Sequence, residues 1–161
     1  MKTQSNKNGF TIIEVVLVLA IAGLIFLIVF LALPALQRSQ RDTQRRGDAS
    51  RMLSQLEAYA GNRNGNYPSS TAQLTTFINT YMTNGGQSFQ DPQGSNYTVQ
   101  YRTYSAGYTA PTAAGRIDYI TSAACNDSGN GNNVLTAGAG NRSVAVVTYL
   151  EQGGYFCQDN K

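Results

Sequence analysis

Residues 9–36 read GFTIIEVVLVLAIAGLIFLIVFLALPAL and contain a single charged side chain, that of Glu14. The part without charge, residues 15–36, is long enough as a helix, at about 1.5 Å per residue, to match the ~30 Å hydrocarbon core of a bilayer. A secretory signal has a shorter apolar region of roughly 7–15 residues and a small-x-small cleavage site, and neither feature fits well here. We therefore expect this stretch to remain in the mature protein and to span a membrane.

A short polar leader precedes the apolar stretch. Residues 1–9 carry Lys2 and Lys7, and they meet the apolar residues abruptly at the Gly9-Phe10 junction. Glu14 follows within the apolar residues, where an unpaired carboxylate is unfavourable. Its presence indicates either a partner for the charge or a favourable place in the first helical turn.

The sequence Gly9-Phe10-Thr11-Ile12-Ile13-Glu14, followed by about twenty apolar residues that include Gly23, resembles the precursor signature of type IV pilins and of the related secretion and competence pseudopilins. The resemblance implies that a prepilin peptidase cleaves between Gly9 and Phe10 on the cytoplasmic side and methylates the new amine of Phe10. It also implies that Glu14 pairs with the N-terminal amine of an adjacent subunit during assembly.

The chemistry of cleavage explains why such a pair would form. Cleavage before Phe10 creates an ammonium group at the start of an apolar helix, so each subunit carries a cation and an anion that are both unfavourable in hydrocarbon unless they are paired. Neighbouring subunits can neutralise these charges for each other. Pro34 lies three residues later than the family pattern leads us to expect, and we predict a kink or local melting between Gly23 and Pro34.

The apolar helix is expected to continue as an amphipathic helix over residues 37–60. Five residues at helical spacing form its apolar face, namely Met52, Leu53, Leu56, Tyr59 and Ala60. Five arginines lie on this part of the chain, namely Arg38, Arg41, Arg45, Arg46 and Arg51. We interpret them as a solvated helix face in preference to a nucleic-acid site, with lipid head groups or acidic neighbours in a fibre as other partners.

Residues 61–161 are predicted to form a globular head. Turn-forming residues 61–68 must end the first helix, and their Asn-Gly-Asn-Tyr-Pro core also resembles the junction after the first helix of many pilins. A second helix should begin near Ser70, which has capping-box spacing to Gln73, and should end before Asn84. Strands are expected at residues 97–104, 116–121, 143–150 and 154–158, the last two as a hairpin.

These elements predict an α+β fold. A long N-terminal helix, membrane-spanning in its first half and amphipathic in its second, should pack against a small antiparallel β-sheet head, as in pilins. The expected organisation is a leader at 1–9 removed by prepilin peptidase, a fibre-core helix at 10–36, the amphipathic half at 37–60 and the head at 61–161.

Cys125 and Cys157 are the only two cysteines in the chain. The resemblance places the C-terminal part outside the cytoplasm, where an even number of cysteines favours a disulfide, like the one that bounds the C-terminal region of many pilins. The alternative is a pair of free thiols. A zinc site lacks enough ligands, and a catalytic thiol lacks a histidine, because the chain has none.

Other chemistry receives little support from the sequence. The segment at residues 126–133 suggests a calcium loop, but it has one carboxylate, and Ala137 stands where the twelfth ligand of an EF-hand would be acidic. The many tyrosines after residue 80 indicate sheet packing more than stacking on DNA, which is unsupported as a partner. No serine has a paired base and no carboxylate dyad is recognisable. We expect no enzyme, no metal and no cofactor.

The function implied is a structural subunit of a type IV pilus. The precursor would be anchored in the cytoplasmic membrane with its head outside, then polymerised by an assembly platform protein and an ATPase into an extracellular fibre that serves adhesion, twitching motility, DNA uptake or secretion. One alternative is a minor pilin or a pseudopilin of a type II secretion or competence system. The other is a single-pass adhesive or receptor domain that never polymerises.

Overall fold

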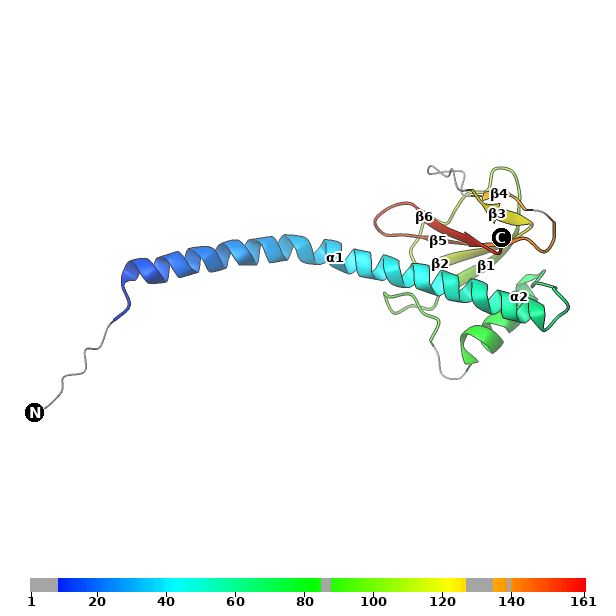
Figure 1. Cartoon of the computed structure of the whole chain (residues 1–161), viewed down its shortest axis with the longest axis horizontal. Coiled ribbons are helices and arrows are strands. Elements are labelled where there is room, and N and C mark those ends of the chain that lie inside the picture. The colour runs from blue at the N-terminus through cyan, green and yellow to red at the C-terminus, as the bar shows by residue number, and fades with distance from the viewer. Residues whose placement is uncertain (1–8, 85–87, 127–134, 139) are drawn as a thin grey trace, which may run out of the picture. The chain divides into compact units, whose positions relative to one another are not determined.

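The computed structural model describes residues 9–84, 88–126, 135–138 and 140–161 (Figure 1). The chain forms two units, Met1–Gln37 and Arg38–Lys161, which we call the N-terminal unit and the head. The elements are α1 (Ile12–Gly61), α2 (Thr71–Phe77), the short π-helix η1 (Ile78–Met82), β1 (Thr98–Thr103), β2 (Arg116–Thr121), β3 (Ala123–Cys125), β4 (Leu135–Ala137), β5 (Val144–Tyr149) and β6 (Tyr155–Asp159).

The helix α1 is continuous through both Gly23 and Pro34. Its apolar first part has no break in the hydrogen-bonded helix around the proline, although proline removes one helical donor. The structure shows no melting between Gly23 and Pro34, and the kink that we expect there stays a prediction.

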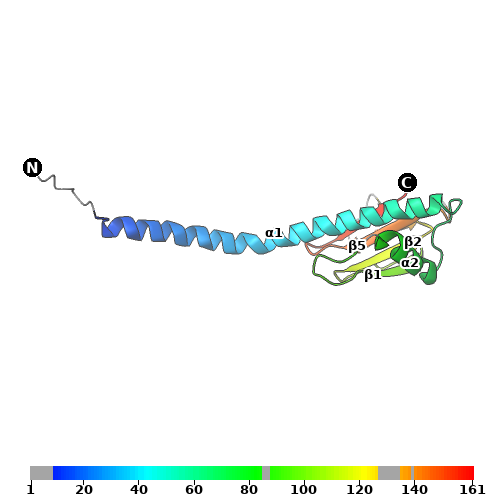
Figure 2. The same cartoon turned by 90° about the horizontal axis from the view of Figure 1, so that it is seen from below.

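In the head, α1 lies along one face of the sheet (Figure 2). All five residues of its predicted apolar face are buried, which confirms that interpretation. Met52, Leu56 and Tyr59 pack with Ile117 and Tyr119 of β2 in the larger of two apolar clusters. Helical spacing thus fixes which side of α1 the head covers.

The main sheet has four strands in the order β1-β2-β5-β6. The pairs β2-β5 and β5-β6 are antiparallel, as expected, and the last two strands form the predicted hairpin. The pair β1-β2 is parallel, so the expectation of a wholly antiparallel sheet is wrong there. The connection at residues 104–115 explains the difference, because about a dozen residues suffice to return a chain to the same end of a sheet.

The two central strands, β2 and β5, are buried on both faces. Residues Ile117 and Tyr119 face α1, whereas Ile120 of the same strand belongs to a second cluster on the opposite face. That second cluster also contains Ala123 of β3 and Leu135 of β4, which form a two-stranded ribbon that was not predicted. With three residues each, these strands are too short for a sequence pattern.

The second helix begins as predicted. Ser70 is its N-cap, and the Ser70 hydroxyl accepts the Gln73 backbone N–H. The side chain of Gln73 reaches back to the backbone N–H of Ser69, at 2.8 Å. The helix then widens into η1, which ends at Met82, before Asn84 as expected.

Candidate processing and assembly site

The Gly9-Phe10 junction lies outside regular structure, just before α1 begins at Ile12. Both residues are exposed, Phe10 to 89%. A side-chain carbon added at Gly9 would meet no other atom within 4 Å. The peptide bond between these residues is therefore accessible, and its backbone is not bound up in helical hydrogen bonds.

Thr11 and Glu14 form a reciprocal cap at the start of α1. The Glu14 carboxylate accepts the Thr11 backbone N–H at 3.0 Å and the Thr11 hydroxyl at 2.9 Å. The Thr11 hydroxyl oxygen lies 3.4 Å from the Glu14 backbone N–H, which donates to it. This is a capping box of the Thr-x-x-Glu type. The role of Thr11 was not predicted, although its spacing of three residues from Glu14 is that of a capping box.

The exposed apolar surface of the described chain is concentrated in one place. Every exposed large apolar side chain among the described residues belongs to residues 10–36, and the described part of the head exposes none. The same segment makes α1 the one helix in the described ranges that is long and apolar enough to cross a membrane. In water, apolar surface on this scale requires a cover.

Residues 4–30, which include this junction and cap, match the family model of the prokaryotic N-terminal methylation motif. The chain carries the methylation motif. The motif contains the leader junction of type IV pilins and pseudopilins, so the predicted resemblance is confirmed. No curated protein and no solved structure matches the chain.

The methylation motif points to a structural subunit of the type IV pilin or pseudopilin class. It implies processing by a prepilin peptidase and contact with an assembly machinery, and together with the apolar helix it fits a membrane-anchored precursor. The motif ends at residue 30, so the head must be described from its own contacts.

Within the head, a buried ion-pair network centres on Arg45, which has no exposed surface. Its Nε and Nη2 atoms donate to the two carboxylate oxygens of Asp91, at 2.6 and 3.0 Å. Nη2 also donates to Glu151 at 2.7 Å, and Nη1 donates to Asp42 at 3.2 Å. Arg41 makes a forked pair with the same Glu151, with its shortest contact at 2.6 Å.

This network ties two distant segments to α1. The Asp42 carboxylate accepts the backbone N–H groups of Glu151 and Gln152, at 2.8 and 3.0 Å, and so caps the turn between β5 and β6. The Asp91 carboxylate also accepts the backbone N–H of Gln93 in its own loop. The sequence suggests only the Asp42–Arg45 pair, three residues apart, because the other partners are remote in the chain.

The expectation that the five arginines form a solvated face is wrong for Arg45 and incomplete for Arg41 and Arg51, because both of these pair with a carboxylate of the head. A buried guanidinium persists where carboxylates pair it and accept its N–H groups, and three carboxylates do so here. The hydrogen bonds from Arg41, and then those from Arg45, lower the pKa of Glu151 to about 2, although partial burial acts in the opposite direction.

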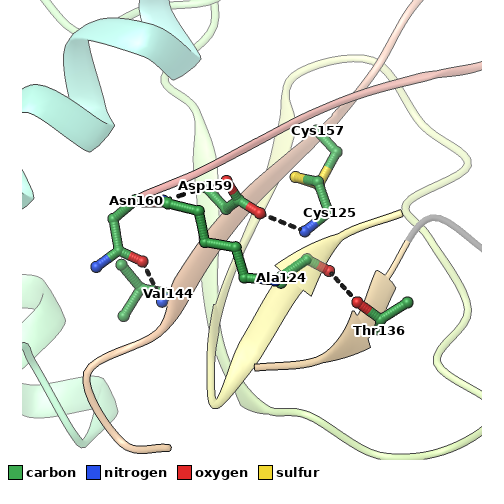
Figure 3. Close-up of a disulfide and its surroundings, with 8 residues drawn as sticks. Ala124, Cys125, Thr136, Val144, Cys157, Asp159 and Asn160 are labelled. Carbon is green, nitrogen blue, oxygen red and sulfur yellow. Dashed lines mark hydrogen bonds between the residues drawn. A yellow bond between two sulfur atoms is a disulfide. The ribbon is translucent and has the colours of Figure 1, made fainter. Parts of the chain in front are cut away.

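Cys125 and Cys157 form the predicted disulfide, with Cα atoms 5.8 Å apart (Figure 3). It joins β3 to β6. Beside it the Cys125 backbone N–H donates to Asp159 at 2.7 Å, and Asn160 accepts the Val144 backbone N–H at 2.9 Å. The disulfide and these hydrogen bonds therefore add to the pairing of β6 with β5 in holding the C-terminal residues on the sheet.

Two other features that the sequence singled out are the segment considered as a calcium loop and the many tyrosines. The segment considered as a calcium loop lies outside the described residues, apart from Asn126. Several of the tyrosines pack in or against the apolar clusters, as the sequence indicates, and the hydroxyl of Tyr119 donates to the Pro68 carbonyl at 3.0 Å.

Proposed function

We propose that this chain is a structural subunit of a type IV pilus, held in the membrane as a precursor and polymerised through its N-terminal helix. The observation that carries the proposal is the coincidence of the methylation motif with the exposed apolar surface of residues 10–36. The N-terminal unit has the apolar surface of a membrane span and of a fibre core, and the described part of the head has no comparable apolar surface.

Processing would occur at the accessible Gly9-Phe10 bond and would remove residues 1–9. Cleavage leaves Phe10 directly before Thr11, so the capping box survives and the new ammonium lies one residue from it. The Glu14 carboxylate is thus held near the end of the mature chain. In the precursor it bonds Thr11, and in the fibre it would also meet the amine of a neighbouring subunit.

Polymerisation replaces lipid around residues 10–36 by the same helices of neighbouring subunits. The hydrophobic effect does not drive this exchange within the bilayer, because lipid chains are as apolar as the helices. It stabilises the product once the subunit has left the membrane, at about 25 cal/mol for each Å² kept from water. A platform protein and a separate ATPase would supply the work of extraction, and a kink or melting between Gly23 and Pro34 would adjust the helix to the fibre.

The head would lie outside the cytoplasmic membrane and then on the surface of the extracellular fibre. Its Cys125–Cys157 disulfide supports that location, since disulfides persist in oxidising compartments. Such a fibre is compatible with a function in adhesion, twitching motility, secretion or DNA uptake.

The deciding experiment is mass spectrometry of the chain isolated from sheared fibres and from membranes. We expect a fibre form that begins at Phe10, carries one additional methyl group on its amine and lacks two hydrogens at the cysteines. A chain that keeps residues 1–9 and never enters fibres would overturn the proposal and favour a membrane-anchored receptor or adhesive domain. Counting copies in the fibre separates a major pilin, which dominates by mass, from a minor pilin or a pseudopilin.

A further inference from the structure

The end of α1 forms a rigid turn with an unusual backbone. Asn64 and Gly65 both have positive φ, 57° and 80°. The Gly65 backbone N–H donates to the Ala60 carbonyl at 2.8 Å, the long bond of a Schellman-type helix end. The backbone N–H of Asn66 donates to the Arg63 carbonyl at 3.1 Å. These backbone hydrogen bonds therefore hold the side chains of the turn in defined positions.

A cleft of about 510 Å³ lies beside the turn. Its lining consists of Tyr59, Arg63, Asn64, Asn66, Tyr67, Ser69 and Gln73. The buried ring of Tyr59 is held edge-on by Phe77 and Tyr81, with ring centres 5.7 and 5.5 Å away. The volume falls within the roughly 300–1,000 Å³ of small-ligand sites, and this side of the cleft is firmly packed.

Two cations flank the turn, and neither has an ion pair among the described residues. The Arg63 guanidinium lies 4.6 Å from the centre of the Tyr59 ring. The Arg142 guanidinium lies against Gly65, where an added side-chain carbon would come within 3.2 Å of its Cζ atom. The C-terminal end of a helix contributes only about half a negative charge. Both guanidinium groups are therefore available to an anion that binds beside the turn.

Several polar groups of the cleft also have no protein partner. The Asn64 amide, the Tyr59 hydroxyl and the Gln73 Nε2 atom make no hydrogen bond to another described residue. Amides and hydroxyls of this kind both donate and accept, which suits sugar hydroxyl groups. A guanidinium adds a planar fork that matches a carboxylate.

We propose that this cleft binds an acidic glycan, that is, a hydroxyl-rich chain that carries carboxylates. The cations would bind the carboxylates, and the amides and hydroxyls would bind the sugar hydroxyl groups. A nucleic acid is a poorer match, because its affinity depends on many phosphate contacts and the turn offers two arginines. A neutral or apolar ligand would leave both cations without a partner.

The test uses the full-length chain in a non-ionic detergent, with binding measured by isothermal titration calorimetry. The ligands are polygalacturonate, which has a carboxylate on every sugar, neutral dextran, and polyphosphate, which is anionic but has no sugar hydroxyls. The variants are Arg63→Gln, Arg142→Gln and Asn64→Gly, the last chosen because glycine keeps the left-handed backbone of the turn. Arg38→Gln is the matched control, since Arg38 is an exposed arginine away from the turn.

We expect polygalacturonate to bind and dextran not to bind. Arg63→Gln should weaken binding at least about tenfold and Asn64→Gly several-fold, because a charge-assisted hydrogen bond contributes more than a neutral one. Arg38→Gln should bind as the unaltered chain does.

Three results would overturn the proposal: no binding of polygalacturonate, equal loss in Arg38→Gln and Arg63→Gln, or polyphosphate binding as tight as polygalacturonate with Asn64→Gly unaffected. The tyrosine circular dichroism of each variant verifies its fold. The chain is unassembled in this test, so the outcome is independent of whether it forms pili.

Discussion

The N-terminal unit and the head differ in whether their apolar side chains and charged groups find partners within the same chain. The N-terminal unit leaves its large apolar side chains exposed, whereas the described head buries its apolar side chains and pairs even its buried arginine. The first unit needs a cover for its apolar surface, which would be lipid or, under the proposed function, other copies of itself, whereas the head supplies its own partners. The exposed large apolar side chains of the described chain thus lie before Arg38, and the ion pairs and apolar clusters that stabilise the subunit lie after it.

The largest effect should come from Gly9→Leu, because it blocks the step that creates the mature N-terminus. We expect the leader to remain attached and fibres to fall to background. Gly23→Leu is the matched control for processing, since it makes the same replacement within the apolar helix and should be cleaved normally. The measurements are N-terminal sequencing and the yield of sheared fibres. Normal fibres from Gly9→Leu would refute the processing assignment.

Replacements at Glu14 can separate its two roles. Glu14→Gln removes the charge but keeps an oxygen that can accept from Thr11, since glutamine also serves in capping boxes. Thr11→Ala removes the side chain that completes the cap and keeps the charge. If the charge pairs with a neighbouring amine, Glu14→Gln should be cleaved yet reduce fibre yield at least about tenfold.

Under the same hypothesis Thr11→Ala should assemble at nearly the normal yield. The opposite ranking, with Glu14→Gln assembling normally and Thr11→Ala failing, would assign Glu14 to helix capping alone. Immunoblots of membrane and sheared-fibre fractions give both readouts, cleavage and assembly, from one culture.

In the head, Arg45→Met should destabilise the fold by about 3–5 kcal/mol, because it leaves the buried Asp91 carboxylate without its cation and removes one of the two cations that pair with Glu151. Arg38→Met, at an exposed position of the same helix, should change stability by less than about 0.5 kcal/mol. All ten tyrosines lie between residues 59 and 155. Thermal unfolding of the full-length chain followed by tyrosine circular dichroism therefore reports on the head.

The contrast between the units also explains what the sequence could predict. The residues of the methylation motif are contiguous, from the Gly9-Phe10 junction through Glu14 to the apolar stretch. The buried face of α1 repeats at helical spacing, so both features could be predicted from the local sequence. The strands β5 and β6 and the cysteine pair were predictable for the same reason, from short patterns and a count of two.

Features that depend on distant partners were not predictable. The carboxylates that pair Arg45 come from a loop at Asp91 and a turn at Glu151, and no local pattern links them. The parallel direction of β1 depends on how residues 104–115 return, which is a tertiary property. The cleft beside Asn64 depends on the left-handed turn together with Tyr59 and Gln73 from two helices.

Removal of the disulfide should destabilise the head slightly less than loss of Arg45. The bridge closes a loop with a sequence separation of 32 residues, for which the chain-entropy account gives about 3–4 kcal/mol. Cys125→Ala with Cys157→Ala in one chain avoids a lone thiol. A melting temperature in this double variant equal to that of the unaltered chain would show that β6 pairing and the hydrogen bonds of Asp159 and Asn160 hold the C-terminal residues without help from the disulfide.

The smallest expected effect is the pH dependence of stability that comes from the Glu151 carboxylate. The pKa of Glu151 is about 2 in the folded head and 4.5 ordinarily, so its ion pairs contribute their full stability above pH 4.5 and lose it as the pH falls towards 2. The groups that face it are Arg41, Arg45 and the Gln93 amide. Glu151→Gln should therefore melt below the unaltered chain at pH 7, and the difference should shrink between pH 4.5 and 2. Since other carboxylates titrate in both chains, the difference isolates Glu151, and a gap that stays constant with pH would mean that Arg41 and Arg45 do not depend on its charge.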